Sequence, residues 1–157
     1  MRYLALDIGD KRTGLATGDS FTRVATPAGA LEIPLDRDSG EALLTAIERE
    51  AATRLGPEAG SGDLVVGLPL NMDGSEGPRA ALVRAFAARL AERTGRTVHL
   101  ADERLTTEEA RWRMARTGLS RKQKKQRKDA LAAAAILEAF LAEQARAEAP
   151  GPSTEGS

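Results

Sequence analysis

The start of the chain is the feature that most constrains its fold. Residues 3–6 form a short apolar run, typical of a strand buried on both faces, and the run leads directly into the carboxylate of Asp7. Gly9 permits a tight reversal, and residues 13–16 resume a strand pattern, so the two runs predict a β-hairpin. A buried strand that ends in Asp, followed by Gly and two basic residues, is suited to hold a divalent metal beside a phosphate. The alternative is a plain turn with solvated basic residues.

Strand and helix patterns alternate along the rest of the chain. They predict strands within residues 23–33, 64–66 and 97–101, and helices over residues 41–55, 78–93, 106–117 and 129–145. Residues 56–62, rich in Gly, Pro and Ser, are expected to form a loop. The last helix is apolar nearly all round until Glu138, so it is expected to be largely buried. This order predicts an α/β fold, a central mixed sheet of about five strands flanked by helices on both faces.

Length and composition indicate one domain in a reducing compartment. The chain has 157 residues, and we expect a single domain over residues 1–147 and a disordered polar tail over residues 148–157. The absence of cysteine excludes disulfides and thiolate metal sites. No apolar run approaches the roughly 20 residues of a membrane span, and the N-terminus lacks a signal-peptide pattern. We therefore expect a soluble, cytoplasmic protein with no membrane partner.

Positive charge is concentrated in one segment, although the formal net charge is zero. Between residues 110 and 128 every charged residue is basic: Arg111, Arg113, Arg116, Arg121, Lys122, Lys124, Lys125, Arg127 and Lys128. A local basic field matters more for phosphate binding than net charge does, so the segment predicts a nucleic-acid partner. A solvated, partly disordered loop is the alternative. Trp112 within the segment could stack on a base, or cover apolar surface.

Acidic residues stand at the ends of three predicted buried elements. Asp7 ends the first strand, Asp102 and Glu103 end the last strand, and Asp129 begins the buried helix. Ligands of open α/β sheets gather at the carboxyl ends of strands, so the first two sets could converge. Asp129 could instead serve only as a helix N-cap. Glu103 could likewise pair with Arg104 or cap the next helix.

A group of acids is tolerated where a cation offsets the repulsion among them. With no Cys and one His, the oxygen ligands favour Mg²⁺ or Mn²⁺. Two such ions about 4 Å apart can activate a water and stabilise the leaving oxygen of a phosphodiester. Carboxylates for the metal, with Lys11, Arg12 and Arg104 for the phosphate, form a coherent nuclease site.

Two further features have a functional and a structural interpretation. The glycines and proline of residues 67–74 shape a strand-to-helix turn, or else Asn71 and Ser75, just before a helix, receive a phosphate. His99 lies inside a predicted strand, where a packed or half-exposed histidine is expected rather than a catalyst.

Several motifs follow one another in a fixed order. They are Leu-Asp-Ile-Gly (6–9) with Lys-Arg-Thr-Gly (11–14), Val-Gly-Leu-Pro-Leu-Asn-Met-Asp-Gly (66–74), Asp-Glu-Arg-Leu-Thr-Thr (102–107) and Lys-Asp-Ala-Leu-Ala-Ala (128–133). Together, from residue 2 to about residue 141, they resemble the YqgF/RuvX family of bacterial proteins. That resemblance implies a ribonuclease H-like fold, a kinship with Holliday junction resolvases and a role as a pre-16S rRNA nuclease. The loop at residues 56–62 and the tail after Pro150 depart from the family pattern, away from the proposed site.

The resemblance also implies which residues act. The metal-binding and catalytic acids would be Asp7, an acid of the Asp-Glu-Arg motif, and Asp129. We favour Glu103 over Asp102 as the second acid, because alternation along a strand places the two on opposite sides. Asp102 remains an alternative candidate for a metal ligand. The expected substrate-binding residues are Lys11, Arg12, Asn71, Arg104, Arg121, Lys122, Lys124 and Lys125.

The expected function is a metal-dependent nuclease that processes the 5′ end of pre-16S rRNA, as a monomer or weak homodimer. The main alternative is a resolvase of four-way DNA junctions, which requires a two-fold dimer and an apolar patch. Only Trp112, Met114 and parts of the last helix are available for such a patch, and the core is expected to take up most of these. A non-catalytic nucleic-acid-binding protein fits poorly with acids at all three positions.

The opening motif also resembles the phosphate loop of the actin, heat-shock ATPase and sugar-kinase superfamily. Proteins of that superfamily need two lobes to enclose ATP, and 157 residues cannot form both.

Overall fold

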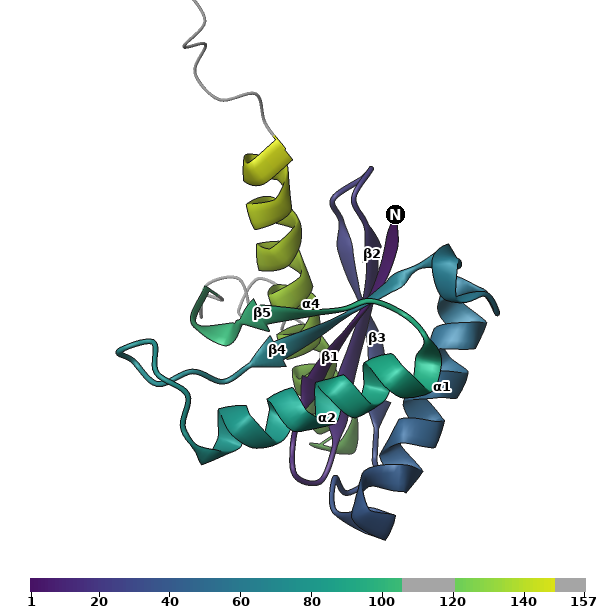
Figure 1. The fold of residues 1–157 in the computed structure, drawn as a ribbon, viewed down its shortest axis with the longest axis vertical. Coiled ribbons are helices and arrows are strands. Elements are labelled where there is room, and N and C mark those ends of the chain that lie inside the picture. The colour runs from purple at the N-terminus through teal and green to yellow at the C-terminus, as the bar shows by residue number, and fades with distance from the viewer. Residues whose placement is uncertain (106–120, 149–157) are drawn as a thin grey trace, which may run out of the picture.

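A five-stranded sheet forms the centre of the computed structural model, which describes residues 1–105 and 121–148 (Figure 1). The strands are β1 (Arg2–Ile8), β2 (Thr13–Asp19), β3 (Ala25–Leu31), β4 (Asp63–Leu68) and β5 (Val98–Asp102). They lie in the order β3-β2-β1-β4-β5. β2 is antiparallel to both of its neighbours, whereas β1, β4 and β5 are parallel. The predicted mixed sheet is confirmed.

β1 and β2 form the predicted hairpin at the centre of this sheet. Their pairing is unbroken from Arg2 opposite Asp19 to Ile8 opposite Thr13. The connecting loop is closed by the Gly9 N–H, which donates to the Arg12 carbonyl at 2.9 Å. A Cβ on Gly9 would lie 2.7 Å from that carbonyl oxygen, so the close approach of the backbone favours glycine there.

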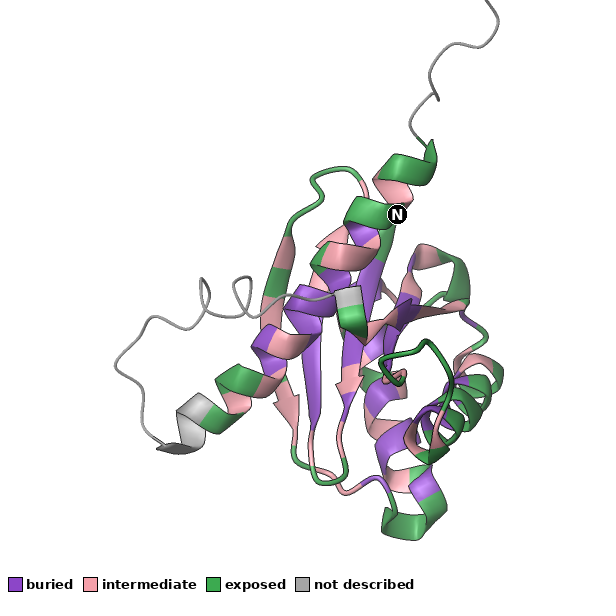
Figure 2. Cartoon of the chain, turned by 90° about the vertical axis from the view of Figure 1, so that its left-hand side faces the viewer, coloured by how far each residue is buried: buried purple, intermediate pink, exposed green. Residues whose placement is uncertain are grey.

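Helices cover both faces of the sheet, as predicted. α1 (Glu41–Leu55) and α2 (Pro78–Thr94) pack on one face, where Leu4 and Leu6 belong to the larger apolar core. α4 (Arg121–Glu148) packs on the other face against a second core that includes Ala5 and Val65. Figure 2 shows that α4 is buried where it crosses the sheet and exposed towards both ends. Alternate residues of β1 therefore serve two different cores.

The start of α4 differs from the prediction. The helix begins at Arg121 rather than at residue 129, and it ends at Glu148, which was expected to open the tail. The alternative interpretation of Asp129 as an N-cap is therefore wrong, and so is the alternative of a loop for residues 121–128. Lys, Arg and Gln favour helix as strongly as most apolar residues do. The apolar periodicity that reveals a helix in the sequence begins only at Ala130. The sequence pattern therefore does not predict the polar turns that precede it.

The remaining predicted helices and strands agree with the structure where it describes the chain. α1 spans residues 41–55 as predicted, and the loop at residues 56–62 holds a single 3₁₀ turn, Ala59–Ser61. Buried Arg96 fastens this loop by donating to the carbonyls of Gly56 and Gly62. The predicted helix at residues 106–117, with Trp112 and Met114, and residues 149–157 of the predicted tail lie outside the described residues. Among the described helices, none is both long and apolar enough to cross a bilayer.

Candidate active site

One level of the sheet, on the face that α4 covers, carries the first predicted catalytic acid. Asp7 pairs with Gly14 of β2, and the parallel register of β1 and β4 places Gly67 on its other side. Alternation puts Asp7 on the same face as Tyr3 and Ala5, which are buried in the core beneath α4. The two strand neighbours of Asp7 on this face are therefore both glycines.

Gly14 brings the backbone of α4 next to Asp7. A Cβ on Gly14 would lie 1.9 Å from the carbonyl oxygen of Asp129, which is far inside van der Waals contact. The helix backbone therefore rests directly on the hairpin at this point. Because paired residues of neighbouring strands lie about 5 Å apart, the Asp129 backbone is adjacent to Asp7. A side chain at position 14 would push the helix, and with it Asp129, off the sheet.

Gly67 provides the space that Glu103 occupies. Glu103 opens a 3₁₀ turn, Glu103–Leu105, directly after β5. A Cβ on Gly67 would lie 2.9 Å from Oε1 of Glu103 and 2.6 Å from Cδ1 of Ile136 in α4. The Glu103 carboxylate therefore lies over Gly67, next to the strand that carries Asp7. Asp7, Glu103 and Asp129 come from three separate elements and share one face and one level of the sheet.

Asp129 is engaged by a basic residue of the hairpin loop. Nε of Arg12 donates to Oδ2 of Asp129 at 2.7 Å, and the two side chains are 33% and 24% exposed. Over residues 1–105 and 121–148, no three acidic or histidine side chains are grouped in a way that could hold a metal ion. The acids are neighbours in this conformation without forming a finished cluster, and the joint metal site stays a prediction.

Asp102 has a different environment from Glu103. Alternation along β5 places it with Val98 and Leu100, on the face away from α4. Nη2 of Arg104 donates to its carboxylate at 2.7 Å, and the Arg104 N–H donates at 2.9 Å. Hydrogen bonds from the Arg104 side chain lower the pKa of Asp102, and the same contact raises the pKa of Arg104. The geometry therefore groups Glu103, rather than Asp102, with Asp7.

The loop between β4 and α2 is bonded mainly within itself. Nδ2 of Asn71 donates to Oγ of Ser75 at 3.1 Å, and Oγ of Ser75 donates to the carboxylate of Asp73 at 2.6 Å. Nη1 of Arg104 donates to the carbonyl of Met72 at 3.1 Å. The negative charge of Asp73 beside Ser75 opposes phosphate binding, so this arrangement favours the turn-shaping interpretation of Asn71.

The other predicted phosphate contacts lie on the hairpin loop and on α4. Lys11 is exposed next to Arg12. Lys125 is exposed on α4, and so are Arg127 and Lys128. Arg121, Lys122 and Lys124 belong to the first turns of α4, and their side chains lie outside the described part of the structure.

Sequence reasoning missed Arg79, which ties α2 to the end of β1. Nη2 of Arg79 donates to the carbonyl of Ile8 at 2.7 Å, and the same guanidinium pairs with Asp10. No motif marks this residue, because its partners are a backbone group and a loop acid far away in the sequence. Gly14 and Gly67 do occur in motifs, but a sequence does not reveal which backbone or carboxylate approaches a glycine.

His99 is a packed histidine, as expected. Its Nε2 lies 2.9 Å from Oδ2 of Asp63, and its ring contacts Tyr3 and Phe140 with centroid distances of 5.9 and 5.1 Å. Asp63 begins β4, so this cluster lies at the opposite end of the parallel strands from Asp7 and Glu103.

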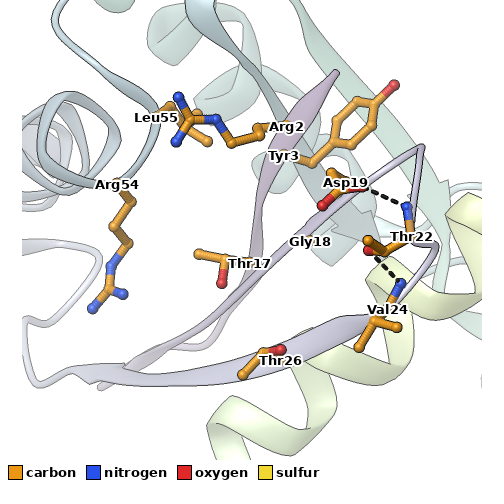
Figure 3. Close-up of a pocket in the computed structure, with 10 residues that line it drawn as sticks. All are labelled: Arg2, Tyr3, Thr17, Gly18, Asp19, Thr22, Val24, Thr26, Arg54 and Leu55. Carbon is orange, nitrogen blue, oxygen red and sulfur yellow. Dashed lines mark hydrogen bonds between the residues drawn. The ribbon is translucent and has the colours of Figure 1, made fainter.

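A pocket of about 540 Å³ also lies away from the acids (Figure 3). Arg2, Thr17, Thr26 and Arg54 surround it, near the start of β1 and the end of α1. Asp19, at its rim, accepts hydrogen bonds from two backbone N–H groups of its own turn. None of the predicted site residues lines this pocket, so it is not part of the candidate site.

Comparison with known proteins identifies the family. The family model described as "RuvX: Holliday junction resolvase" matches residues 1–143. The chain belongs to the RuvX family. The resemblance inferred from the motifs is thereby confirmed.

Two relatives and one solved structure agree with this assignment. A protein of Anaeromyxobacter sp. (strain Fw109-5) is 48% identical over 90% of this chain and 96% of its own length. One from Pelotomaculum thermopropionicum is 40% identical over 93% and 90%. Each is named "Putative pre-16S rRNA nuclease". The structure titled "T. thermophilus RuvC in complex with Holliday junction substrate" has a TM-score of 0.53 at 15% identity, covering 94% of this chain and 96% of that one. The fold is ribonuclease H-like.

The contact between Gly14 and Asp129 predicts a large effect of a small substitution. Gly14→Ala would force a methyl group against the α4 backbone, which cannot move aside as a flexible side chain can. We expect the free energy of unfolding, measured by urea denaturation, to fall by about 2 kcal/mol or more. Gly60→Ala is the matched control, since a Cβ there meets nothing within 4 Å, and it should change stability by less than about 0.5 kcal/mol. Equal stability of the two variants would contradict the close packing.

The pairing of Asp102 with Arg104 predicts a pH dependence. A lowered carboxyl pKa contributes stability that is complete above the ordinary value of about 3.9 and is lost as the pH falls through the lowered pKa. Arg104→Gln should return the pKa of Asp102 towards its ordinary value and remove this part of the acid sensitivity. An NMR titration of the Asp102 carboxyl carbon measures the shift. Arg84→Gln, which breaks the exposed pair with Glu76, should leave that pKa unchanged.

Proposed function

We propose that this protein is a metal-dependent nuclease that cleaves precursor 16S rRNA at its 5′ side, in the cytoplasm. The observation that carries the proposal is the placement of Asp7, Glu103 and Asp129 on one face and one level of the sheet, where two glycines bring them together. Membership of the RuvX family supports phosphodiester hydrolysis, and the names of the relatives support an RNA substrate.

The donor set suits a hard divalent cation. The three acids offer carboxylate oxygens, the chain contains no Cys, and its one His is engaged with Asp63 at the far end of the sheet. Such a set is typical of Mg²⁺ or Mn²⁺. Asp7, Glu103 and Asp129 would hold the metal, for which we propose two ions. Bound there, the metal would supply an activated water and charge stabilisation for the leaving oxygen.

Basic residues lie next to these acids along the chain, in the hairpin loop and on α4. Lys11 and Arg12 occupy the hairpin loop that follows Asp7, and exposed Arg127 and Lys128 directly precede Asp129 on α4. Guanidinium and ammonium groups so placed bind backbone phosphates irrespective of base sequence. Their role is to bring a phosphodiester to the carboxylates and to orient it.

A four-way DNA junction is the second candidate substrate, because the family model carries the description of a junction resolvase. Symmetric cleavage of a junction requires two active sites in a stable dimer, and stable dimers bury sizeable apolar patches. Among the described residues, the exposed large apolar side chains are Met1, Phe21, Val24, Met72 and Leu82. Met1, Phe21 and Val24 lie together at the β2–β3 turn, where the Ser20 N–H donates to the Met1 carbonyl, and Met72 and Leu82 lie on the β4–α2 loop and on α2. A group of three such side chains is smaller than the interface of a stable dimer. We therefore favour a monomer or weak dimer that cuts flexible RNA.

The first test of this function is the charge of Asp7. Asp7→Asn keeps the shape of the side chain and removes a metal-binding charge, so we expect cleavage of a precursor-like 5′ RNA in Mg²⁺ or Mn²⁺ to be abolished. The circular dichroism spectrum should stay that of the wild type. Cleavage products are resolved on a denaturing gel.

Glu92→Gln is the matched control, because Glu92 is exposed on α2, on the opposite face of the sheet. It should retain full activity. The same assay compares the RNA with a four-way DNA junction at micromolar protein, with the association state measured in parallel. Full activity of Asp7→Asn would end the proposal, and paired nicks in the junction by a stable dimer, with the RNA intact, would reassign the substrate.

A second prediction concerns the basic start of α4. Replacement of Lys122, Lys124 and Lys125 by Gln should weaken binding of all RNA sequences alike. Each lost phosphate contact should lower the slope of log K against log salt by about 0.7 for a single strand, which fluorescence anisotropy can measure at several salt concentrations. Arg84→Gln on α2 is the control that should leave the slope unchanged. An unchanged slope in the triple variant would show that these lysines do not contact the RNA.

A further inference from the structure

The contact between Arg12 and Asp129 occupies a carboxylate that the proposed metal site needs. Nε of Arg12 lies 2.7 Å from Oδ2 of Asp129. In the part of the chain that the structure describes, no group of three acids is arranged to take up a metal. One cationic side chain thus offsets the negative charge that a metal would otherwise offset.

We propose that Arg12 is a positioning residue that exchanges between Asp129 and a substrate phosphate. When a backbone phosphate takes the guanidinium, the Asp129 carboxylate becomes available to the metal; without substrate, Arg12 holds it. Phosphate binding and metal binding are thereby coupled through one side chain. This inference rests on the proposed nuclease function and specifies how its site is assembled.

The backbone on both sides of this contact is held in place, so the exchange needs side-chain motion alone. The hairpin loop is closed by the bond from the Gly9 N–H to the Arg12 carbonyl at 2.9 Å. The Asp129 carbonyl lies against Gly14, without room for even one added carbon. A rotation of Arg12 about its own side-chain bonds is therefore the simplest movement that separates the pair.

The chemistry of the pair permits such an exchange. Both side chains are partly exposed, at 33% and 24%, so a phosphate can reach the guanidinium. An ion pair with this exposure favours the paired over the separated side chains by a factor of less than about ten. A competing anion can therefore displace it. Guanidinium carries five N–H donors in a fork that matches phosphate oxygens, and the bond to Asp129 uses one of them.

Thermodynamic reciprocity gives a test that involves no cleavage. If Asp129 and phosphate compete for Arg12, removal of the Asp129 charge must release Arg12 and tighten RNA binding. The probe is a fluorescein-labelled single-stranded RNA of about 12 nucleotides, titrated in EDTA so that no metal-dependent cleavage occurs. The proteins are the wild type, Asp129→Asn, Arg12→Gln and the double variant, each checked for a native circular dichroism spectrum.

We expect Asp129→Asn to bind the RNA about three- to ten-fold more tightly than the wild type, and this gain to fall below about two-fold in the Arg12→Gln background. The double-variant comparison is the internal control, because simple repulsion between Asp129 and the RNA would persist without Arg12. An equal gain in both backgrounds, or no gain, would overturn the exchange.

Metal binding without RNA tests the other half of the coupling. Arg12→Gln should bind Mn²⁺ about three- to five-fold more tightly than the wild type in calorimetry, because the carboxylate is then uncontested. Lys11→Gln is the matched control: it removes the same charge from the neighbouring position, and it should gain less. Equal gains in Mn²⁺ affinity would show that the effect arises from net charge alone, and would contradict a specific contact between Arg12 and Asp129.

These measurements separate the failure of the exchange from the failure of the proposed function. If the wild type cleaves RNA in Mg²⁺ but the variants show neither the gain in RNA binding nor the gain in Mn²⁺ binding, the nuclease proposal stands and the exchange is refuted. Wild-type protein that neither cleaves RNA nor binds Mn²⁺ refutes both.

Discussion

The close approach of α4 to the β-hairpin is the contact on which the site depends. Along β2, the residues that face α4 are Gly14, Ala16 and Gly18, so the strand presents an almost flat backbone surface to the helix. The helix also has small residues at this contact, and two of them, Ala133 and Ala134, are fully buried. Small side chains on both partners allow a backbone contact that larger ones would prevent. The contact fixes the position of Asp129 relative to the strand pair that carries Asp7.

This packing also explains how a chain with so few aromatic residues builds two cores. Aromatic residues make up 3% of the sequence. On the α1 and α2 face, leucine and valine fill a deep layer between helices and sheet. On the α4 face, alanine and glycine bring the helix close to β2, and larger side chains such as Tyr3, Ile136 and Leu137 fill the rest of the layer. This close approach of α4 to β2 suits a functional face, because it keeps acids from different elements near one another.

Charge is separated along this face although the chain is neutral overall. Asp7, Glu103 and Asp129 lie at one level of the sheet, and the described basic residues Lys125, Arg127 and Lys128 lie on the preceding turns of α4. In a protein with no metal bound, acids that lie close together raise the free energy of the folded state unless a cation approaches them. Arg12 is such a cation, and its Coulomb attraction to Asp129 is partly screened by solvent because both side chains are partly exposed.

Much of the fold was accessible from the sequence because its signals are local. The hairpin, the sheet and the bounds of α1 all follow from apolar periodicity and from turn residues that act within a few positions. The start of α4 was not accessible, since a helical turn made only of Lys, Arg and Gln has no apolar period to reveal it. The same limit applies to the site. The motifs pointed to Asp7, Glu103 and Asp129, but the functions of Gly14, Gly67 and Arg79 arise from partners far away in the sequence.

The three acids differ in how firmly the fold holds them, and this difference assigns Arg104 a structural task. Asp7 lies within a hydrogen-bonded strand, and Asp129 lies within a long helix packed on that strand. Glu103 opens only a short 3₁₀ turn at the edge of the sheet. Arg104 follows it and bonds both to Asp102, at the end of β5, and to the Met72 carbonyl. These bonds tie the 3₁₀ turn that carries Glu103 both to the end of β5 and to the β4–α2 loop.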